Sequence, residues 1–445
     1  MVKLWQNEAV DWLIQPRVDA ENEPLTLRVG ADGRTLELTV GQSPTLELVR
    51  RAAAKGLKTA RELGGRSVLL DASGLNADEA AALLQGAELA AYRQESWKSD
   101  PKPPVELYVT GADGDALAET AAVTRGVCFA RDLVNCPANR LTPEQMAQRM
   151  AQAAEAAGLE VEILDEHDAR ALGMGAFLAV GDSAGHPPRL IVLRWRGGRP
   201  ENAPIALVGK GVCCDTGGYC LKSAAGLRGM KGDMAGGAAV CGALLALAEN
   251  RVPVNAVAVI PAVENRISPD SNLPGDVVIS MSGKSIEIAN TDAEGRLILA
   301  DAVTYAIQKE HASRVVDIAT LTGAIVRMLG FTTAGLLTNN EEFCAELQSA
   351  AAQSGEQYWR MPDFPEYRRM IDSPLADLCN QSSDGCGAIT AGLFIGAFAE
   401  HTPWIHLDIA GTAWTDRPRR EYQVKGATGA GVTTLYELCK RLADG

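Results

Sequence analysis

Short apolar runs alternate with amphipathic stretches along the first part of the chain, a pattern typical of an α/β domain. The expected strands cover 25–29, 35–40, 67–73 and 105–111, and the expected helices cover 47–64 and 77–93. A polar, proline-bearing segment at 95–104 is expected to be a surface connection.

A long helical pattern over 116–135 marks the change to a second region. A chain of 445 residues exceeds the size of most single domains, so at least two domains are expected. We therefore predict an N-terminal α/β domain over 1–115, a connecting helix over 116–136 and a C-terminal domain over 137–445.

Continuous apolar runs separated by helical stretches follow in the second region. The runs cover 159–165, 189–195, 204–214, 254–263 and 314–320, and the clearest helical stretches cover 236–250 and 296–310. Strands without polar alternation are buried on both faces. The sequence therefore predicts two α/β domains, the second built on a mixed central sheet covered by helices on both faces.

Composition and charge argue against several classes of partner. The net charge is −14, and the first 115 residues carry 13 Lys and Arg against 18 Asp and Glu, whereas nucleic-acid binding needs a basic surface. The chain lacks an apolar run of about 18 residues, and its first residues do not resemble a secretory leader. Its 10 cysteines lack disulfide-framework spacing, which favours reduced thiols and a cytoplasmic location.

The segment "NTDAEGRL" (290–297) precedes the helical stretch at 296–310 and allows two interpretations. Thr291 and Glu294 have the spacing of a helix capping box, and acids in a first turn suit the helix dipole. Gly295 weakens this structural interpretation, because glycine costs about 1 kcal/mol inside a helix. Arg296 also has no part in a capping box.

Other ionisable residues follow expected strands at glycine-rich turns. "GKGVCCDTGGYCLK" (209–222) contains Lys210, Asp215 and Lys222, and "GMKGDMAGGAA" (229–239) places Asp233 before a helix. Sites in α/β proteins form at strand ends, so these groups are expected to converge with 290–297. Three aspartates and a glutamate would repel one another unless cations compensate, and oxygen ligands suit Mg²⁺, Mn²⁺ or Zn²⁺.

Other motifs fail on their spacing or their residue types. "SGKS" at 282–285 would need glycine at 278 to be a P-loop, but Val278 stands there, and a hairpin explains Gly283 better. The chain has no H-E-x-x-H motif, and His406 lies in an apolar run typical of a core histidine. Cys213 and Cys214 are neighbours on an expected strand and point to opposite faces, so core thiols are the favoured interpretation.

On these motifs the sequence resembles the leucyl aminopeptidase family, the cytosol aminopeptidases of peptidase family M17. "NTDAEGRL" stands as the family signature, supported by "VGKGVCCDTGG", "MKGDMAGGAA", "DIATLTGA", "GAITAGLF" and "HLDIAGTAW". The resemblance covers about 130–432, and "GGYCLK" and "GATGAGV" look more like the shorter peptidase B branch.

The resemblance implies a two-metal-ion aminopeptidase whose C-terminal domain is catalytic. The implied metal ligands are Lys210, Asp215, Asp233, Asp292 and Glu294. Within that set, Asp215 and Glu294 would bridge the metals, Asp292 would complete one shell, and Lys210 and Asp233 would complete the other. Lys210 can ligate only as a neutral amine, so its pKa would have to fall below its ordinary value of about 10.4.

The same resemblance implies that Lys222 stabilises the oxyanion and that Arg296 holds a bicarbonate acting as general base. The implied metals are Mn²⁺ or Zn²⁺, with Mg²⁺ and Co²⁺ as alternatives. The implied substrates are peptides with a free N-terminus, with broad or acidic-residue preferences open, and the implied assembly is a homohexamer. Atypical residues at neighbouring positions are Cys213, Cys214, Thr216, Cys220 and Ser223.

Two alternatives remain open at this point. Acidic clusters with divalent ions also serve phosphatases and other phosphoryl-transfer enzymes, although a lysine among the ligands argues against that chemistry. A DNA-binding role, known for some relatives in the family, is disfavoured by the acidic N-terminal region.

Overall fold

The chain forms two compact units in a computed structural model. The structure describes residues 2–17, 24–41, 44–95, 97–99, 104–182, 184–382 and 384–443, so part of the expected connection at 95–104 lies outside the described residues. One unit comprises 1–128 and 415–426, and the other comprises 129–414 and 427–445. The division falls within helix α3 (Gly114–Asn135). The boundary at 115 and the separate connector over 116–136 stay predictions.

The first unit is built on a six-stranded sheet with strand order β1-β6-β5-β2-β4-β3. The pairs are parallel except that of β3 with β4. The elements are β1 (Val2–Leu4), β2 (Trp12–Arg17), β3 (Leu27–Val29), β4 (Thr35–Thr39), α1 (Leu46–Glu62), β5 (Ser67–Asp71), α2 (Ala77–Ala91) and β6 (Glu106–Thr110).

The two helices of this unit begin where the sequence supplies capping side chains. Thr45 accepts a hydrogen bond from Leu48 N at the start of α1, and Asn76 and Glu79 form a capping box at the start of α2. The helices pack closely at Gly86, where an added Cβ would lie 2.1 Å from the carbonyl oxygen of Arg50. A side chain at 86 would therefore push α2 away from α1 and open the core of the unit.

The second unit contains the larger, mixed sheet, with strand order β16-β15-β18-β14-β9-β11-β8-β7 and with β10 paired to β11. The pairs β15–β18, β11–β8 and β8–β7 are antiparallel and the other pairs are parallel. The strands are β7 (Glu160–Leu164), β8 (Arg189–Arg196), β9 (Ile205–Gly209), β10 (Gly211–Asp215), β11 (Asn255–Asn265), β14 (Arg314–Ala319), β15 (Thr333–Thr338), β16 (Gln357–Arg360) and β18 (Trp404–Asp408).

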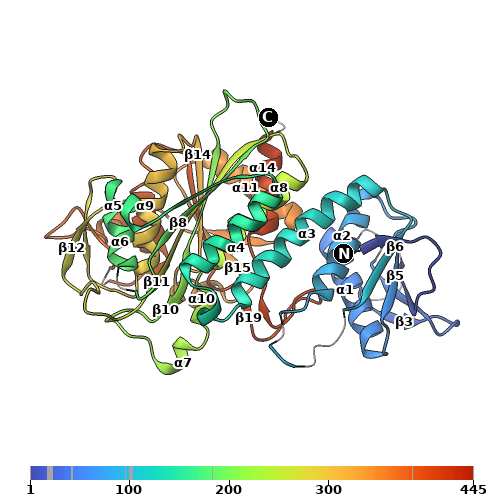
Figure 1. The fold of residues 1–445 in the computed structure, drawn as a ribbon. Coiled ribbons are helices and arrows are strands. Elements are labelled where there is room, and N and C mark those ends of the chain that lie inside the picture. The colour runs from blue at the N-terminus through green and yellow to red at the C-terminus, as the bar shows by residue number, and fades with distance from the viewer. Residues whose placement is uncertain are drawn as a thin grey trace. The chain divides into compact units, whose positions relative to one another are not determined.

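Helices cover both faces of this sheet, with α4 and α8 on one face and α6 and α9 on the other (Figure 1). The helices are α4 (Pro143–Ala156), α5 (Glu166–Ala171), α6 (Gly175–Gly181), α7 (Ala224–Leu227), α8 (Ala235–Glu249), α9 (Glu294–Gln308), α10 (Gly323–Leu329), α11 (Glu341–Ser354), α12 (Pro365–Arg369), α13 (Gly387–Gly396) and α14 (Val432–Ala443), with 3₁₀ turns η1 (Ala138–Arg140) and η2 (Met230–Gly232). Helix α8 is apolar around most of its circumference because it is buried between the sheet and α14. The predicted α/β class with a covered, mixed central sheet is confirmed.

Among the described residues, five short strands lie outside the two larger sheets. They are β12 (Asp276–Ile279), β13 (Ser285–Ile288), β17 (Leu378–Cys379), β19 (Trp414–Thr415) and β20 (Gly426–Ala427). Strands β12 and β13 form the antiparallel hairpin expected around Gly283, which has a φ of 88° in the turn. The rejection of a P-loop at this position is therefore consistent with the structure.

One segment that was expected to form a single strand forms two. The apolar run at 204–214 is divided at Lys210 into β9 and β10. Lys210 N donates to Ile318 O at 3.1 Å, and Lys210 O accepts from Gly237 N at 2.7 Å. The break depends on these contacts with β14 and α8, which the apolar pattern does not reveal.

Along the described ranges, no helix has both the length and the apolar composition needed to cross a bilayer.

Candidate active site

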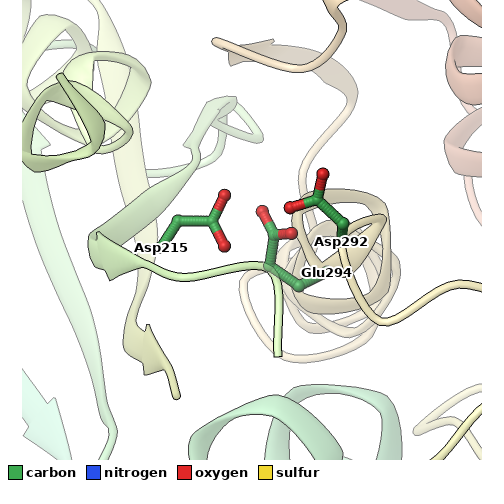
Figure 2. Close-up of side chains that lie close together, drawn as sticks. All are labelled: Asp215, Asp292 and Glu294. Carbon is green, nitrogen blue, oxygen red and sulfur yellow. The ribbon is translucent and has the colours of Figure 1, made fainter. Parts of the chain in front are cut away.

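Three aspartate and glutamate side chains from two distant segments converge in the second unit. Asp215 lies at the end of β10, Asp292 lies just before α9, and Glu294 is the first residue of α9. One carboxylate oxygen from each lies within 4.8 Å of the other two (Figure 2). The convergence predicted from "NTDAEGRL" and "GKGVCCDTGG" is thus observed for these three residues.

Lys210 joins this carboxylate cluster to Asp233. Its Nζ lies 2.8 Å from Glu294 Oε1 and 2.9 Å from Asp233 Oδ2. Burial lowers the pKa of Lys210, but the negative charges of Asp233, Glu294 and Asp215 outweigh burial and raise it above its ordinary value. This direction is opposite to the lowered pKa expected of a ligand, so ligation of a cation by Lys210 would require loss of this proton.

Lys222 contacts the other side of the cluster. Its Nζ lies 2.6 Å from Asp215 Oδ2 and also pairs with Asp292. Burial lowers the pKa of Lys222, whereas Asp215 and Glu294 raise it, and the net pKa is above the ordinary value. Lys222 is therefore a charged donor at the edge of the cluster.

Burial raises the pKa of three carboxyl groups of the cluster, and neighbouring negative charges add to the rise. Burial raises the pKa of Asp233 to about 8, with Lys210 opposing the rise and Asp215 adding to it. Burial and the charge of Asp215 likewise raise the pKa of Glu294. Burial also raises the pKa of Asp292, against the hydrogen bond from Lys222. Such upward shifts are typical of acids gathered for a functional purpose.

Arg296 lies in the first turn of α9 and takes no part in the ion pairs that Lys210 and Lys222 make with the carboxylates. It is 8% exposed, and its Nη1 donates to Asn380 O at 2.8 Å. Burial lowers its pKa to about 10, with Glu294 opposing the shift. Its Nε is buried without a hydrogen-bond partner among the residues that the structure describes. Arg296 thus retains a donor that an anion could occupy.

Of the two interpretations of 290–297, the capping box between Thr291 and Glu294 is wrong. Helix α9 begins at Glu294, and Ala293 holds the N-cap position without a side-chain cap. Thr291 Oγ1 instead donates to Gly217 O at 2.7 Å and accepts from Cys220 N at 2.8 Å. These partners lie more than 70 residues away in the sequence, so local spacing alone suggested the wrong role.

Glycines make room for the cluster at two points. An added Cβ at Gly295 would lie 2.8 Å from Lys210 Nζ, and one at Gly217 would lie 2.9 Å from Asp292 Oδ1. Gly217 also has a φ of 86°, a conformation that glycine adopts without strain. The glycine within "DAEGR" is thus explained by the approach of Lys210.

Three further residues support the cluster and are not among those predicted from the sequence. Asn265, at the end of β11, donates to Asp215 Oδ1 at 2.9 Å, and Thr320 Oγ1 donates to Asp233 Oδ1 at 2.8 Å. Asn380 holds the 289–290 backbone by accepting from Ala289 N at 2.9 Å and Asn290 N at 3.2 Å. Asn265 could have been noticed as a polar residue that ends a long apolar strand.

His406 and the paired cysteines lie outside the cluster. His406 is fully buried and its Nδ1 lies 2.5 Å from Asp317 Oδ1, in agreement with the prediction of a core histidine. Cys213 is buried with its Sγ 3.5 Å from Met146 Sδ, whereas Cys214 is partly exposed. The core-thiol interpretation therefore suits Cys213 better than Cys214.

The donor set fits divalent cations. Three carboxylates within 4.8 Å of one another and a fourth beside Lys210 form an oxygen-rich site. Asp233 Oδ2 is buried and pairs with Lys210 Nζ at 2.9 Å. A buried set of carboxylates beside a lysine is suited to hold metal ions once that lysine loses its proton.

Comparison with known proteins identifies the family. Residues 128–436 match the cytosol aminopeptidase family, catalytic domain. The chain belongs to this family. It is accordingly a metal-dependent aminopeptidase that acts on peptides, and the family and enzyme class predicted from the motifs are confirmed.

Relatives of this aminopeptidase match nearly the whole chain. A probable cytosol aminopeptidase of Clostridium perfringens is 44% identical over 414 residues, which cover 89% of this chain and 84% of that protein. Another, of Alkaliphilus metalliredigens, is 40% identical and covers 97% of this chain and 91% of its own. The solved structure of the bottromycin maturation enzyme BotP in complex with Mn has a TM-score of 0.89 and 35% identity, and covers 98% of this chain and 100% of its own.

Proposed function

We propose that this aminopeptidase uses two divalent metal ions to hydrolyse the N-terminal peptide bond of peptides. The proposed ligands are Lys210, Asp215, Asp233, Asp292 and Glu294. Of these, Asp215 and Glu294 would bridge the two ions. Asp292 would complete one shell, and Lys210 and Asp233 would complete the other. The observation that carries the proposal is the mutual approach of three carboxylates within 4.8 Å, extended to Asp233 through Lys210.

The metal ions, when bound, supply an activated water and polarise the scissile carbonyl. The free α-amine of the substrate would also be held by one of the metal ions, and this would restrict hydrolysis to the N-terminal residue. The charged Nζ of Lys222, at the edge of the cluster, would donate to the carbonyl oxygen as negative charge develops on it. This interaction strengthens in the transition state, so it raises kcat more than substrate affinity.

Arg296 is the proposed holder of a bicarbonate that serves as general base. Its guanidinium stays protonated at neutral pH, since its pKa falls only to about 10. The planar fork offers parallel donors for a carboxylate-like anion, and one Nε–H is free of hydrogen bonds to described residues. In this role Arg296 orients an anion that accepts the proton of the attacking water.

We propose Mn²⁺ or Zn²⁺ as the working ions, with Mg²⁺ and Co²⁺ as alternatives. The similar BotP structure was solved in complex with Mn, which supports Mn²⁺. A homohexamer and a cytoplasmic location are also proposed. The names of the relatives and the free state of all ten cysteines support the latter. Residues 137–445 are the proposed catalytic domain, preceded by the domain over 1–115 and the connecting helix over 116–136.

Metal analysis and substrate assays test the proposal together. We expect two Mn²⁺ or Zn²⁺ ions per chain by elemental analysis, hydrolysis of leucyl-p-nitroanilide and no hydrolysis of p-nitrophenyl phosphate. A panel of N-terminal residues, including acidic ones, would define the preference. Full activity with a single bound ion per chain would refute the two-metal site. Phosphatase activity with no peptidase activity would refute the proposed reaction.

A further inference from the structure

Asn265 connects the two carboxylates that are proposed to bridge the metals. It is the last residue of β11 and is 1% exposed. Its Nδ2 donates to Asp215 Oδ1 at 2.9 Å and to Thr291 O at 3.0 Å, and it lies 3.4 Å from Glu294 Oε2. One buried amide therefore touches both carboxylates and the backbone between them.

The contacts of Asn265 determine which oxygen of Asp215 faces the site. Asp215 Oδ1 accepts from Asn265 Nδ2 and also from Gly217 N at 2.8 Å. Oδ2, the other oxygen, points toward Lys222 at 2.6 Å. Hydrogen bonds to Oδ1 fix the orientation of the carboxylate and direct Oδ2 toward the positive charge of the site, as partners of metal ligands commonly do.

The backbone of Asn265 also holds the end of the neighbouring strand. Its carbonyl oxygen accepts from Thr216 N and from Thr216 Oγ1, both at 2.9 Å. Thr216 immediately follows Asp215, so Asn265 restrains that ligand through the main chain as well as through the side chain. Hydrogen bonds to Asn265 thereby hold the end of β10 close to the segment that begins at 291.

The neutrality of the amide suits this position. A lysine would place a third positive charge beside the cluster and compete with metal ions, whereas an aspartate would repel Asp215 and Glu294. An asparagine donates hydrogen bonds to both regions without changing the charge of the site. The residue type is thus the one that orients carboxylates while leaving their charge available.

We propose that Asn265 is a positioning residue that sets the orientation of Asp215 relative to Glu294 and so determines the affinity for metal. The inference depends on the proposed two-metal function. Removing the partner of a metal ligand typically weakens metal binding by about 10- to 100-fold. We expect a weakening in that range for Asn265→Ala.

The experiment measures Mn²⁺ affinity by equilibrium competition between the Mn²⁺-loaded full-length enzyme and a chromophoric chelator. Two variants are used, Asn265→Ala and Asn265→Leu, whose side chain also branches at Cγ, so that a folding defect in one does not decide the result. Asn255→Ala is the matched control. Asn255 begins the same strand, is 8% exposed, and donates to Arg199 O at 2.7 Å and to Asn202 O at 2.9 Å. Thermal unfolding of each protein reports its stability.

The inference is supported if both Asn265 variants bind Mn²⁺ at least tenfold more weakly while Asn255→Ala binds as the wild type does. Wild-type affinity in a folded Asn265 variant would overturn it and leave the proposed function intact. An equal loss of affinity in Asn255→Ala would also overturn it, because the effect would then follow stability. A wild-type enzyme that binds no Mn²⁺ would overturn both this inference and the two-metal proposal.

Discussion

Gly295 permits a sharp test, because a single methyl group there should damage the site without damaging the fold. Gly295 is the second residue of α9, and its φ does not require glycine. An added Cβ would lie 2.8 Å from both Nζ and Cε of Lys210 and 2.9 Å from its Cδ. Ordinary contacts begin near 3.4 Å. The end of Lys210 must therefore move by about 0.6 Å or more.

The expected effects on stability and on activity are opposite. Alanine favours a helix over glycine by about 1 kcal/mol, and the crowded atoms belong to a flexible side chain, so the melting temperature should stay the same or rise. Displacing Lys210 disturbs its contacts with Asp233 and Glu294. Misplacement of a catalytic group by about 1 Å can cost about 100-fold in rate. We expect kcat/KM for Gly295→Ala to fall by about 10- to 100-fold.

The assay is hydrolysis of leucyl-p-nitroanilide at saturating Mn²⁺, with calorimetry for stability. Gly114→Ala is the matched control, because Gly114 also lies in the first turn of a helix and an added Cβ there meets nothing within 4 Å. Its activity should match the wild type. Wild-type activity in Gly295→Ala would refute the reasoning. A large drop in its melting temperature would show that the packing argument is wrong.

Three other predictions concern metal binding, chemistry and pH. Asp292→Ala and Glu294→Ala should each abolish hydrolysis with the fold kept by circular dichroism, and near-wild-type kcat at saturating Mn²⁺ in either would contradict their ligand role. Lys222→Ala should lower kcat much more than it changes KM while two metals remain bound by elemental analysis; loss of metal would make Lys222 a ligand. Burial raises the pKa of Asp301 to about 7 in the folded protein, whereas an unfolded aspartate titrates at about 3.9. The free energy of unfolding should therefore be highest below about pH 4 and should fall as the pH rises through about 7. The fall due to Asp301 should be on the order of 4 kcal/mol at most. Urea unfolding of the wild type and of Asp301→Asn should therefore show a smaller decline from pH 5 to pH 8 in the variant, and parallel pH profiles would exclude this titration.

Chemistry was predictable wherever the relevant residues are contiguous. The segment 290–297 carries Asp292, Glu294 and Arg296 within five residues, so its unusual content was visible without a structure. The role of Thr291 was not, since its hydroxyl binds Gly217 O and Cys220 N on a distant segment. Local spacing favours a capping box because it contains no information about such partners.

Elements with a strong local pattern were also predicted well. The long apolar strand β11, the buried helix α8 and the β12–β13 hairpin all match expected segments. Strands β1, β2, β15, β16 and β18 were not expected. Of these, β1 and β16 are short and lie at sheet edges, where pairing with a neighbouring strand decides whether a strand forms.

The sequence by itself determined the fold class, the family and the residue types of the candidate site, because periodicity and short motifs are local properties of the chain. Tertiary structure alone decided how these residues meet. Lys210, at the break between β9 and β10, hydrogen bonds with Ile318 and Gly237, and Asp215 accepts a hydrogen bond from Asn265. Such contacts join residues from about 25 to more than 100 positions apart, and only the packing of strands and helices brings them within hydrogen-bond distance.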